Sequence, residues 1–292
     1  MKPLPSFRLH RPGSLKEALE LLSTLEEVKP IAGGTDLIPL LREEGVEIEN
    51  LVDLSYLRGL NYIREEGGFV TIGATTTHTQ LLGSEIVAEK ARALHEAVAN
   101  LGSVQIRNRG TIGGNLCNAS PASDTAPPLL VLGSEVTVAS SKEMRTMPLE
   151  GLFAGPKINS LAVDELLTEI RFPAPPPASG SAFHRIGRRT GFTLSVVNAA
   201  AYVEREKEAC CKVRIAFGSV APTPMRVPEI ESVLEGREPT ASLMEEVGDI
   251  CKGLVRPVDD IRGSARYRCE MARILVKRAL RDAWIRAGGE IQ

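Results

Sequence analysis

A proline-rich segment near residue 175 constrains the fold of this chain more than any other feature. It reads Pro-Ala-Pro-Pro-Pro-Ala-Ser-Gly over residues 173–180. Proline fixes its own φ angle and has no backbone N–H, so neither a helix nor a central strand can run through such a segment. The 292 residues are enough for two domains, one on each side. We therefore predict one domain over residues 1–175 and a second over residues 176–292.

The residues before this boundary are predicted to form both strands and helices, without the repeated strand–helix alternation of a doubly wound fold. Ser14 and Glu17 have the spacing of a capping box, and apolar residues follow them at helical spacing. The stretch 102–128 is rich in small residues and is predicted to be a long, irregular, functional loop. The other predicted elements are strands at 28–32, 50–54, 60–63, 69–74, 135–139 and 166–172, and helices at 37–42, 76–82 and 86–101.

The residues after the boundary are predicted to form strands first and helices afterwards, which is typical of an α+β domain. The last helix is basic, because residues 262–286 hold eight Lys or Arg and two acidic residues. Such a helix face is either solvated or docks on an acidic surface of a partner. The predicted strands are 182–186, 196–204 and 212–220, and the predicted helices are 228–234, 243–255 and 264–287.

Composition and charge exclude several classes of function. The net charge of −2 and the 4% of aromatic residues argue against a nucleic-acid-binding surface. No apolar run approaches the ~18–20 residues of a membrane span, and residues 1–10 lack the apolar core of a secretion signal, so we expect a cytoplasmic protein. The five cysteines are odd in number and show no Cys-x-x-Cys spacing, which indicates reduced thiols and no metal site.

Two glycine pairs about eighty residues apart are the strongest indication of function. They lie in Ile-Ala-Gly-Gly-Thr-Asp-Leu, residues 31–37, and in Thr-Ile-Gly-Gly-Asn, residues 111–115. Glycine lets the backbone approach a bulky anion and adopt the φ > 0 angles at which successive N–H groups converge. Neither loop matches a Walker A or a Gly-x-Gly-x-x-Gly motif. A tight turn explains each loop alone, whereas the two together favour a shared cradle for a pyrophosphate.

The second glycine loop belongs to a longer motif that resembles a known family. Residues 105–124 read Gln-Ile-Arg-Asn-Arg-Gly-Thr-Ile-Gly-Gly-Asn-Leu-Cys-Asn-Ala-Ser-Pro-Ala-Ser-Asp. They resemble the signature of the FAD-binding medium subunit of molybdenum hydroxylases, such as bacterial xanthine dehydrogenase, carbon monoxide dehydrogenase and nicotinate dehydrogenase. Residues 32–37 resemble the first FAD loop of that family, and the likeness extends over nearly the whole chain.

The resemblance implies an α+β fold. The first domain is expected to be an FAD-binding domain of the PCMH (vanillyl-alcohol-oxidase-like) type, with subdomains of about 1–57 and 58–175. The second is expected to be the small α+β domain of the medium subunit, with a three-stranded antiparallel sheet and helices.

The resemblance also implies which residues contact FAD. Asp124 matches an acidic contact, for which an Asx-type turn is the alternative. Leu101 and Leu166 match an apolar and a backbone contact near the flavin ring, with an ordinary place in the core as the alternative. The complete expected set is Pro30, Ile31, Ala32, Gly33, Gly34, Thr35, Asp36, Leu37, Leu101, Thr111, Ile112, Gly113, Gly114, Asn115, Asp124, Leu166 and His184.

One position of this set departs from the family pattern. His184 stands where relatives place a lysine that touches FAD, and a neutral imidazole replaces a hydrogen bond but not a permanent charge. Arg185, Arg188 and Arg189 either supply that charge or form a solvated strand end. No Ser-His-Asp spacing and no His-Glu-x-x-His motif occurs, so no catalytic residue is predicted in this chain.

The resemblance finally implies a role within a larger enzyme. The expected partners are a large molybdenum-cofactor subunit and a small [2Fe–2S] subunit, in a hetero-oligomer such as a dimer of heterotrimers. The chain is expected to accept electrons from the [2Fe–2S] clusters and to pass them through FAD to NAD, a quinone, oxygen or another acceptor. The alternatives are a standalone flavoenzyme similar to the enolpyruvyl-sugar reductases and a non-catalytic interaction subunit.

Overall fold

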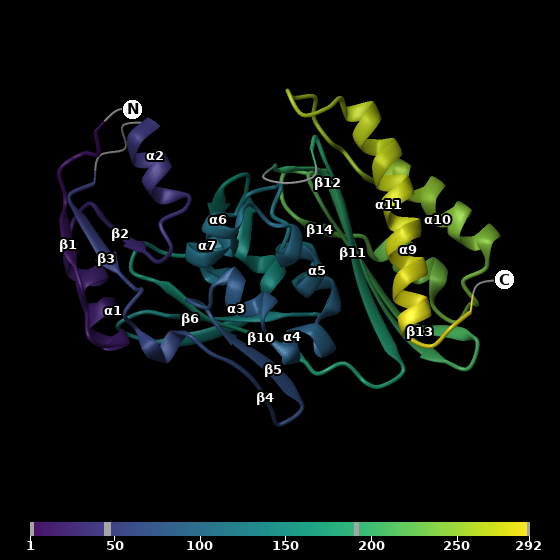
Figure 1. Cartoon of the computed structure of the whole chain (residues 1–292), viewed down its shortest axis with the longest axis horizontal. Helices are drawn as coiled ribbons and strands as arrows, with labels where there is room; N and C mark the ends of the chain where they lie inside the picture. The colour runs from purple at the N-terminus through teal and green to yellow at the C-terminus, as the bar shows by residue number, and fades with distance from the viewer. Residues whose placement is uncertain (1–2, 44–47, 190–192, 291–292) are drawn as a thin grey trace.

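The computed structural model describes residues 3–43, 48–189 and 193–290. Its elements form three units, each built on one main sheet, that follow one another along the molecule (Figure 1). The first unit holds β1 to β3, the central unit β4 to β10 and the last unit β11 to β14. The proline-rich segment lies between β10 (Leu166–Pro173) of the central sheet and β11 (Ser179–Gly187) of the last one. Within these ranges, no helix is both long and apolar enough to cross a membrane.

The first unit is a small parallel sheet with a helix after each of its first two strands. The Ser14 hydroxyl accepts a hydrogen bond from the Glu17 N–H at 3.2 Å, and this cap starts α1 (Leu15–Thr24), which buries Ala18 and Leu22. Helix α2 (Leu37–Glu43) starts directly after the first glycine loop, so that loop stands at the carboxyl end of a parallel strand. The strand order is β1 (Arg8–His10), β3 (Asn50–Asp53), β2 (Val28–Ile31).

The central unit is an antiparallel sheet covered by short helices (Figure 1). Its strand order is β4-β5-β10-β6-β7, and its buried core includes Ile72, Leu94, Ile112 and Leu129. The remaining elements are β4 (Ile63–Glu66), β5 (Phe69–Gly73), β6 (Glu135–Ala139), β7 (Met144–Pro148), β8 (Phe153–Gly155), β9 (Ile158–Asn159), α3 (His78–Leu82), α4 (Glu85–Lys90), α5 (Arg92–Asn100), α6 (Val104–Arg109), α7 (Ile112–Cys117) and α8 (Ala126–Val131), with 3-10 turns at Arg58–Leu60 and Leu149–Leu152.

Two sequence predictions for the central unit were wrong. The helix expected at 86–101 is broken at Ala91 into α4 and α5. The segment 102–128, which was expected to be irregular, holds the three helices α6, α7 and α8, each of six residues. Six residues make less than two helical turns, so they show no apolar periodicity from which to predict a helix.

The last unit is an antiparallel sheet with helices on one face (Figure 1). The three predicted strands are present, and the two-residue strand β14 (Met225–Arg226) adds a fourth to the order β11-β12-β13-β14. Side chains alternate across β11, so Ala182 lies in the core of the last unit and Phe183 in the core of the central unit. The sheet therefore joins the two units. Its other elements are β12 (Ser195–Glu206), β13 (Ala209–Gly218), α9 (Pro228–Leu234), α10 (Ala241–Leu254) and α11 (Ala265–Arg286).

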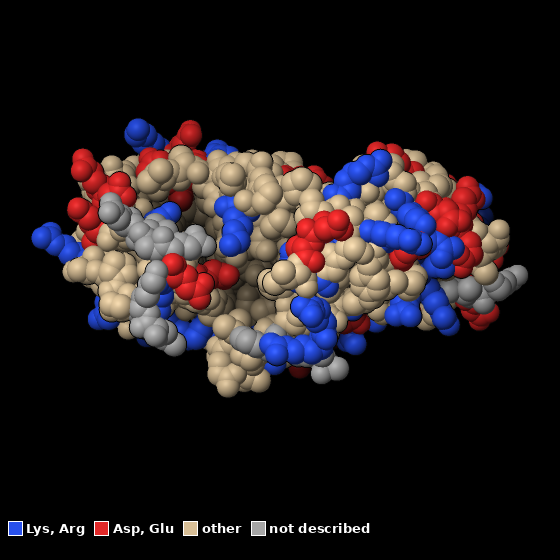
Figure 2. Space-filling view, turned by 90° about the horizontal axis from the view of Figure 1, so that it is seen from above, with Lys and Arg blue, Asp and Glu red and all other residues tan. Residues whose placement is uncertain are grey.

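Several positive charges of the basic helix α11 are paired within the chain. Arg273 donates to Asp249 of α10 at 2.6 Å and to Glu245 at 2.8 Å, and Lys277 donates to Glu245 at 2.6 Å. Figure 2 shows acidic and basic side chains intermingled at this end of the molecule. These ion pairs favour the solvated-face interpretation of the helix over docking on an acidic partner.

Candidate cofactor-binding site

The first glycine loop connects β2 to α2 and offers free backbone donors. Gly34 adopts a φ of +74°, a left-handed angle that glycine reaches without strain. Within the described ranges, the N–H groups of residues 33–36 donate to no protein acceptor. Successive unpaired N–H groups around a left-handed residue form a concavity that suits an anion.

Residues 112–115 of the second glycine loop donate their backbone N–H groups to acceptors within the protein. The Thr111 hydroxyl accepts from the Gly114 N–H at 3.1 Å and so caps α7. The N–H of Ile112 donates to the Thr76 carbonyl at 3.0 Å, and that of Gly113 donates to Ala74 at 2.9 Å. The N–H groups of residues 112–115 are therefore not available to an anion, whereas those of residues 33–36 have no acceptor among the described residues.

Asn115, at the end of the second loop, carries a free side-chain donor. Its Oδ1 accepts from the hydroxyls of Ser123 at 2.8 Å and Thr125 at 2.6 Å. With Oδ1 turned toward the two hydroxyls, Nδ2 points away from them. The Nδ2 group donates to no acceptor in the part of the chain that the structure describes, so it is available to a ligand.

The first loop touches the residues on both sides of the second loop. A Cβ atom added to Gly33 would lie 2.0 Å from the carbonyl oxygen of Arg109, so this close approach requires glycine. On the other side of the loop, Asn118 Nδ2 donates to Asp36 Oδ1 at 3.1 Å. Desolvation by neighbouring atoms raises the pKa of Asp36 above its ordinary value. The sequence separates these loops widely, and the fold brings them together as predicted.

The two glycines of the second loop differ in the space around them. A Cβ atom on Gly113 would lie 2.7 Å from Ala74, so that glycine is required by packing. Outside its own helix, a Cβ atom on Gly114 would meet one described atom within 4 Å, the Thr111 hydroxyl at 2.9 Å. Figure 2 shows the surface hollowed between the first unit and the rest of the molecule. Free N–H groups in one loop and an open glycine in the other fit a pyrophosphate between them.

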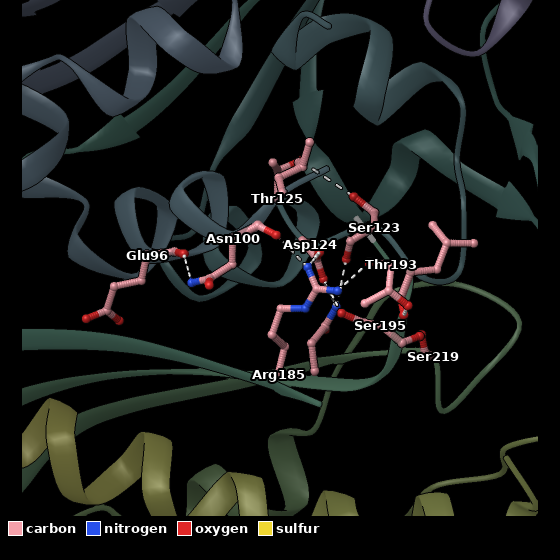
Figure 3. A network of polar contacts seen from close by, with 12 residues as sticks. Glu96, Asn100, Ser123, Asp124, Thr125, Arg185, Thr193, Ser195 and Ser219 are labelled. Atoms are coloured by element: carbon pink, nitrogen blue, oxygen red, sulfur yellow. Dashed lines mark hydrogen bonds and ion pairs between the residues drawn. The ribbon is translucent and has the colours of Figure 1, made fainter. Parts of the chain in front are cut away.

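Asp124 lies where the central unit meets the last unit (Figure 3). Its carboxylate accepts hydrogen bonds from Arg185 at 2.8 Å, Ser195 at 2.5 Å and Asn198 at 2.8 Å. Burial raises the pKa of Asp124, and these three donors oppose that increase by favouring the ionised form. The residue therefore does more than form a turn, because it ties two strands of the last unit to the segment that follows the second glycine loop.

The remaining expected contacts lie in three different environments. Leu101 follows α5 directly and is 8% exposed, while the Leu166 side chain packs in the core of the first unit. His184 bonds to Asp282 of α11 at 2.8 Å, on the face of β11 that packs against the helices. Its neighbour Arg185 points to the opposite face, toward the central unit. The structure does not bring His184 to the glycine loops.

Sequence reasoning missed two polar residues and one histidine. Ser195 and Asn198 lie in a strand of otherwise apolar residues, and a buried amide in such a strand was the available signal, because it needs partners.

His78 is 2% exposed, and its Nδ1 has no partner among the described residues. Burial lowers the pKa of His78 to about 4. The main-chain N–H of His78 donates to the Gly110 carbonyl at 3.0 Å, so His78 lies beside the residue that precedes the second loop.

Family comparisons match almost the whole chain. Residues 5–175 match the FAD binding domain in molybdopterin dehydrogenase, and residues 181–283 match the CO dehydrogenase flavoprotein C-terminal domain. The chain is 34% identical to the carbon monoxide dehydrogenase medium chain of Hydrogenophaga pseudoflava, over 97% of this chain and 98% of that one. It is 31% identical to a putative xanthine dehydrogenase FAD-binding subunit of Escherichia coli, over 97% and 98% of the two chains.

Solved structures agree with this assignment. Carbon monoxide dehydrogenase from Hydrogenophaga pseudoflava superposes with a TM-score of 0.94 at 34% identity, over 97% of this chain and 99% of that one. Quinoline 2-oxidoreductase from Pseudomonas putida gives a TM-score of 0.92 at 28% identity, over 98% and 99%. The cofactor of the present chain is accordingly FAD. The chain belongs to the family of FAD-binding medium subunits of the molybdenum hydroxylases, which are oxidoreductases.

Proposed function

We propose that this chain is the electron-transfer subunit that carries FAD between the [2Fe–2S] clusters of a partner and an external acceptor. The observation that carries this proposal is the pair of touching glycine loops, one with free N–H groups and one with an open glycine. A non-catalytic subunit that had lost FAD would have no need to leave the N–H groups of residues 33–36 without an acceptor among the described residues, whereas packing alone requires Gly33.

The proposed roles of the residues follow from their free groups. The N–H groups of residues 33–36 hold the pyrophosphate, and Asn115 Nδ2 donates to the cofactor from the other side. Asp124 accepts from a hydroxyl of the cofactor through the carboxylate lone pairs that its protein donors leave open. Leu101 makes an apolar contact with the flavin ring, and the Leu166 backbone contacts the flavin side. FAD supplies the redox chemistry, since it accepts and releases electrons singly or in pairs.

We propose as partners a large subunit with a molybdenum cofactor and a small [2Fe–2S] subunit, in a dimer of heterotrimers. Support comes from relatives whose names describe a medium chain, among them carbon monoxide dehydrogenase and nicotine 6-hydroxylase. In our proposal, the molybdenum cofactor and the [2Fe–2S] clusters belong to the partner subunits, and this chain holds only FAD. NAD is the first acceptor to test, followed by quinones and oxygen.

Purification of the chain from its native host under mild conditions tests the assembly. We expect a complex that contains flavin, iron and molybdenum, with a mass of two copies of each of three chains by light scattering. A flavin-only monomer that reduces a substrate by itself would instead indicate a standalone flavoenzyme, and a flavin-free complex would indicate an interaction subunit.

Stopped-flow mixing tests the acceptor. The purified complex is reduced anaerobically with limiting titanium(III) citrate and mixed with NAD, a soluble quinone or oxygen in separate experiments. The acceptor is the compound that restores the absorbance of oxidised flavin early in the reaction. If iron–sulfur absorbance recovers with an acceptor while flavin-depleted complex behaves identically, electrons leave by a route that avoids this chain.

A further inference from the structure

Arg185 of β11 reaches across the boundary between the last and the central unit (Figure 3). Its Nη1 donates to Asp124 at 2.8 Å and to the main-chain carbonyl of Asn100 at 2.9 Å, and its Nη2 donates to the Thr193 carbonyl. The arginine side chain is 11% exposed and the aspartate side chain 7%. One guanidinium thus holds three segments that are far apart in the sequence.

We propose that Arg185 is a positioning residue for the flavin and makes the last unit part of the cofactor site. The inference rests on the proposed function, because it takes Leu101 and Asp124 as cofactor contacts. Arg185 binds the carbonyl directly before Leu101 and the carboxylate of Asp124. Arg185 therefore sets the position of Leu101 relative to Asp124. The carbonyl before Leu101 and the carboxylate of Asp124 are both acceptors, so they do not bond to each other directly.

The network continues from Asp124 to the second glycine loop. Ser123 and Thr125, on either side of Asp124, both donate to Asn115 of that loop. Asn198 of β12 donates to the Ser123 carbonyl at 3.1 Å as well as to Asp124. A shift of Asp124 would therefore move the amide that we assign to the cofactor. The last unit therefore holds residues 123 and 124 directly, and it reaches Asn115 through Ser123 and Thr125.

Charge gives Arg185 a second influence on the site. The Arg185–Asp124 pair is buried, so loss of either partner leaves an uncompensated charge in surroundings of low polarity. Asp124→Asn leaves a net positive charge near the flavin, and Arg185→Met leaves a net negative one. A positive charge favours the reduced, more anionic flavin and a negative charge disfavours it. The two substitutions should therefore shift the flavin reduction potential in opposite directions.

The guanidinium geometry explains why lysine would not suffice. Three acceptors surround Arg185, and a planar fork with several N–H groups can serve them at once. An ammonium group at the end of a flexible chain keeps the charge but not the simultaneous bonds. Arg185→Lys should therefore keep the flavin reduction potential close to the wild-type value while weakening FAD binding. This variant separates the effect of the charge of the residue from the effect of its geometry.

The experiment measures FAD affinity by fluorescence titration of the apo-protein, and the reduction potential and visible circular dichroism of the reconstituted full-length chain. Arg185→Met is expected to weaken FAD binding by at least about tenfold, to lower the potential and to alter the dichroism, and Arg185→Lys is expected to weaken binding less. Asp124→Asn is expected to raise the potential. Equal potentials and affinities in wild type and Arg185→Met would overturn the inference.

Arg286→Met is the matched control. Arg286 also joins the last unit to α5, since it donates to Glu96 and to the Ser181 carbonyl, but the Glu96 side chain points away from the Asp124 network (Figure 3). It should lower thermal stability and leave the flavin potential unchanged. If Arg286→Met shifts the potential as Arg185→Met does, the effect is general loosening of the units and the inference fails. If the wild-type chain binds no FAD at all, the proposed function fails instead.

Discussion

The two glycine loops share a sequence pattern and differ in what their backbones do. Among the described residues, the N–H groups of residues 33–36 in the first loop have no acceptor, whereas those of residues 112–115 in the second loop donate to Ala74, Thr76 and Thr111. We propose that the first loop binds the cofactor pyrophosphate and that the second loop mainly supports it. A glycine pair therefore does not define a role by itself, because the partners of its N–H groups decide whether it binds or anchors.

The glycines themselves differ in the same way. Gly33 and Gly113 are needed because protein atoms approach them closely, the Arg109 carbonyl in one case and Ala74 in the other. A Cβ atom on Gly114 would meet one described atom within 4 Å, the Thr111 hydroxyl that caps its helix. Substitutions at these positions therefore separate the loss of packing between the loops from the loss of space for the cofactor.

Gly33→Val should have the largest effect. Its Cβ atom would lie 2.0 Å from the Arg109 carbonyl oxygen, and backbone cannot yield as a flexible side chain can. The loops would separate, FAD would be lost, and the free energy of unfolding should fall by ~3 kcal/mol or more, at the upper end of overpacking costs. Flavin-to-protein ratio and urea unfolding measure both effects. Gly59→Val is the control, since its Cβ would meet no described atom within 4 Å. Full flavin content in Gly33→Val would contradict the contact between the loops.

Gly114→Val should also abolish FAD retention, but with less damage to the apo-protein. The added side chain occupies the space that we assign to the cofactor and meets the Thr111 hydroxyl within the protein. Valine in place of glycine in a helix carries little intrinsic cost. We expect the last unit to stay folded, as judged by unfolding of the apo-protein and by limited proteolysis. A variant with normal flavin occupancy would show that the cofactor does not lie over the second loop.

Acid should weaken the support beneath the second loop. The pKa of His78 is about 4 in the folded chain, below the ordinary 6.5, because burial disfavours the charged ring. The unfolded state therefore binds the proton first as the pH falls from about 6.5 toward 4. Stability present above pH 6.5 is lost in that window, by up to ~3 kcal/mol. Urea unfolding at pH 7 and pH 4.5 tests this, and His78→Gln should flatten the difference. An unchanged slope in that variant would assign the acid sensitivity to other groups.

Local features of the fold were predictable from the sequence, whereas the different hydrogen bonding of the two glycine loops was not. Helix α9 begins and ends at the predicted residues 228 and 234, since its proline start and apolar spacing are local signals. The glycine loops were predictable from residue type. Which N–H groups stay free was not, because the partners Ala74 and Thr76 lie more than thirty residues away in the sequence. The partners of Asp124 are farther still, on strands of another unit.

The smallest predicted effect concerns the hydrogen bond between the loops. Asn118→Ala removes the bond from Asn118 Nδ2 to Asp36 Oδ1, which lies near the surface and contributes ~0.5–1.5 kcal/mol. Asn118 caps the C-terminus of helix α7, which is held in place by its hydrogen bonds to the central unit. The bond to Asp36 therefore restricts the movement of the first loop. FAD affinity should therefore fall by up to about tenfold, while the flavin spectrum stays normal.

Ser55→Ala is the control for that substitution, because Ser55 makes a similarly exposed bond to Asp53 in the same unit at 2.6 Å. It should leave FAD affinity unchanged. If the two variants bind FAD equally well, the first loop holds its shape without help from the second, and the contact at Gly33 alone joins them. If Asn118→Ala alone binds more weakly, the binding loop depends on the anchored loop through a side chain as well as through packed backbone.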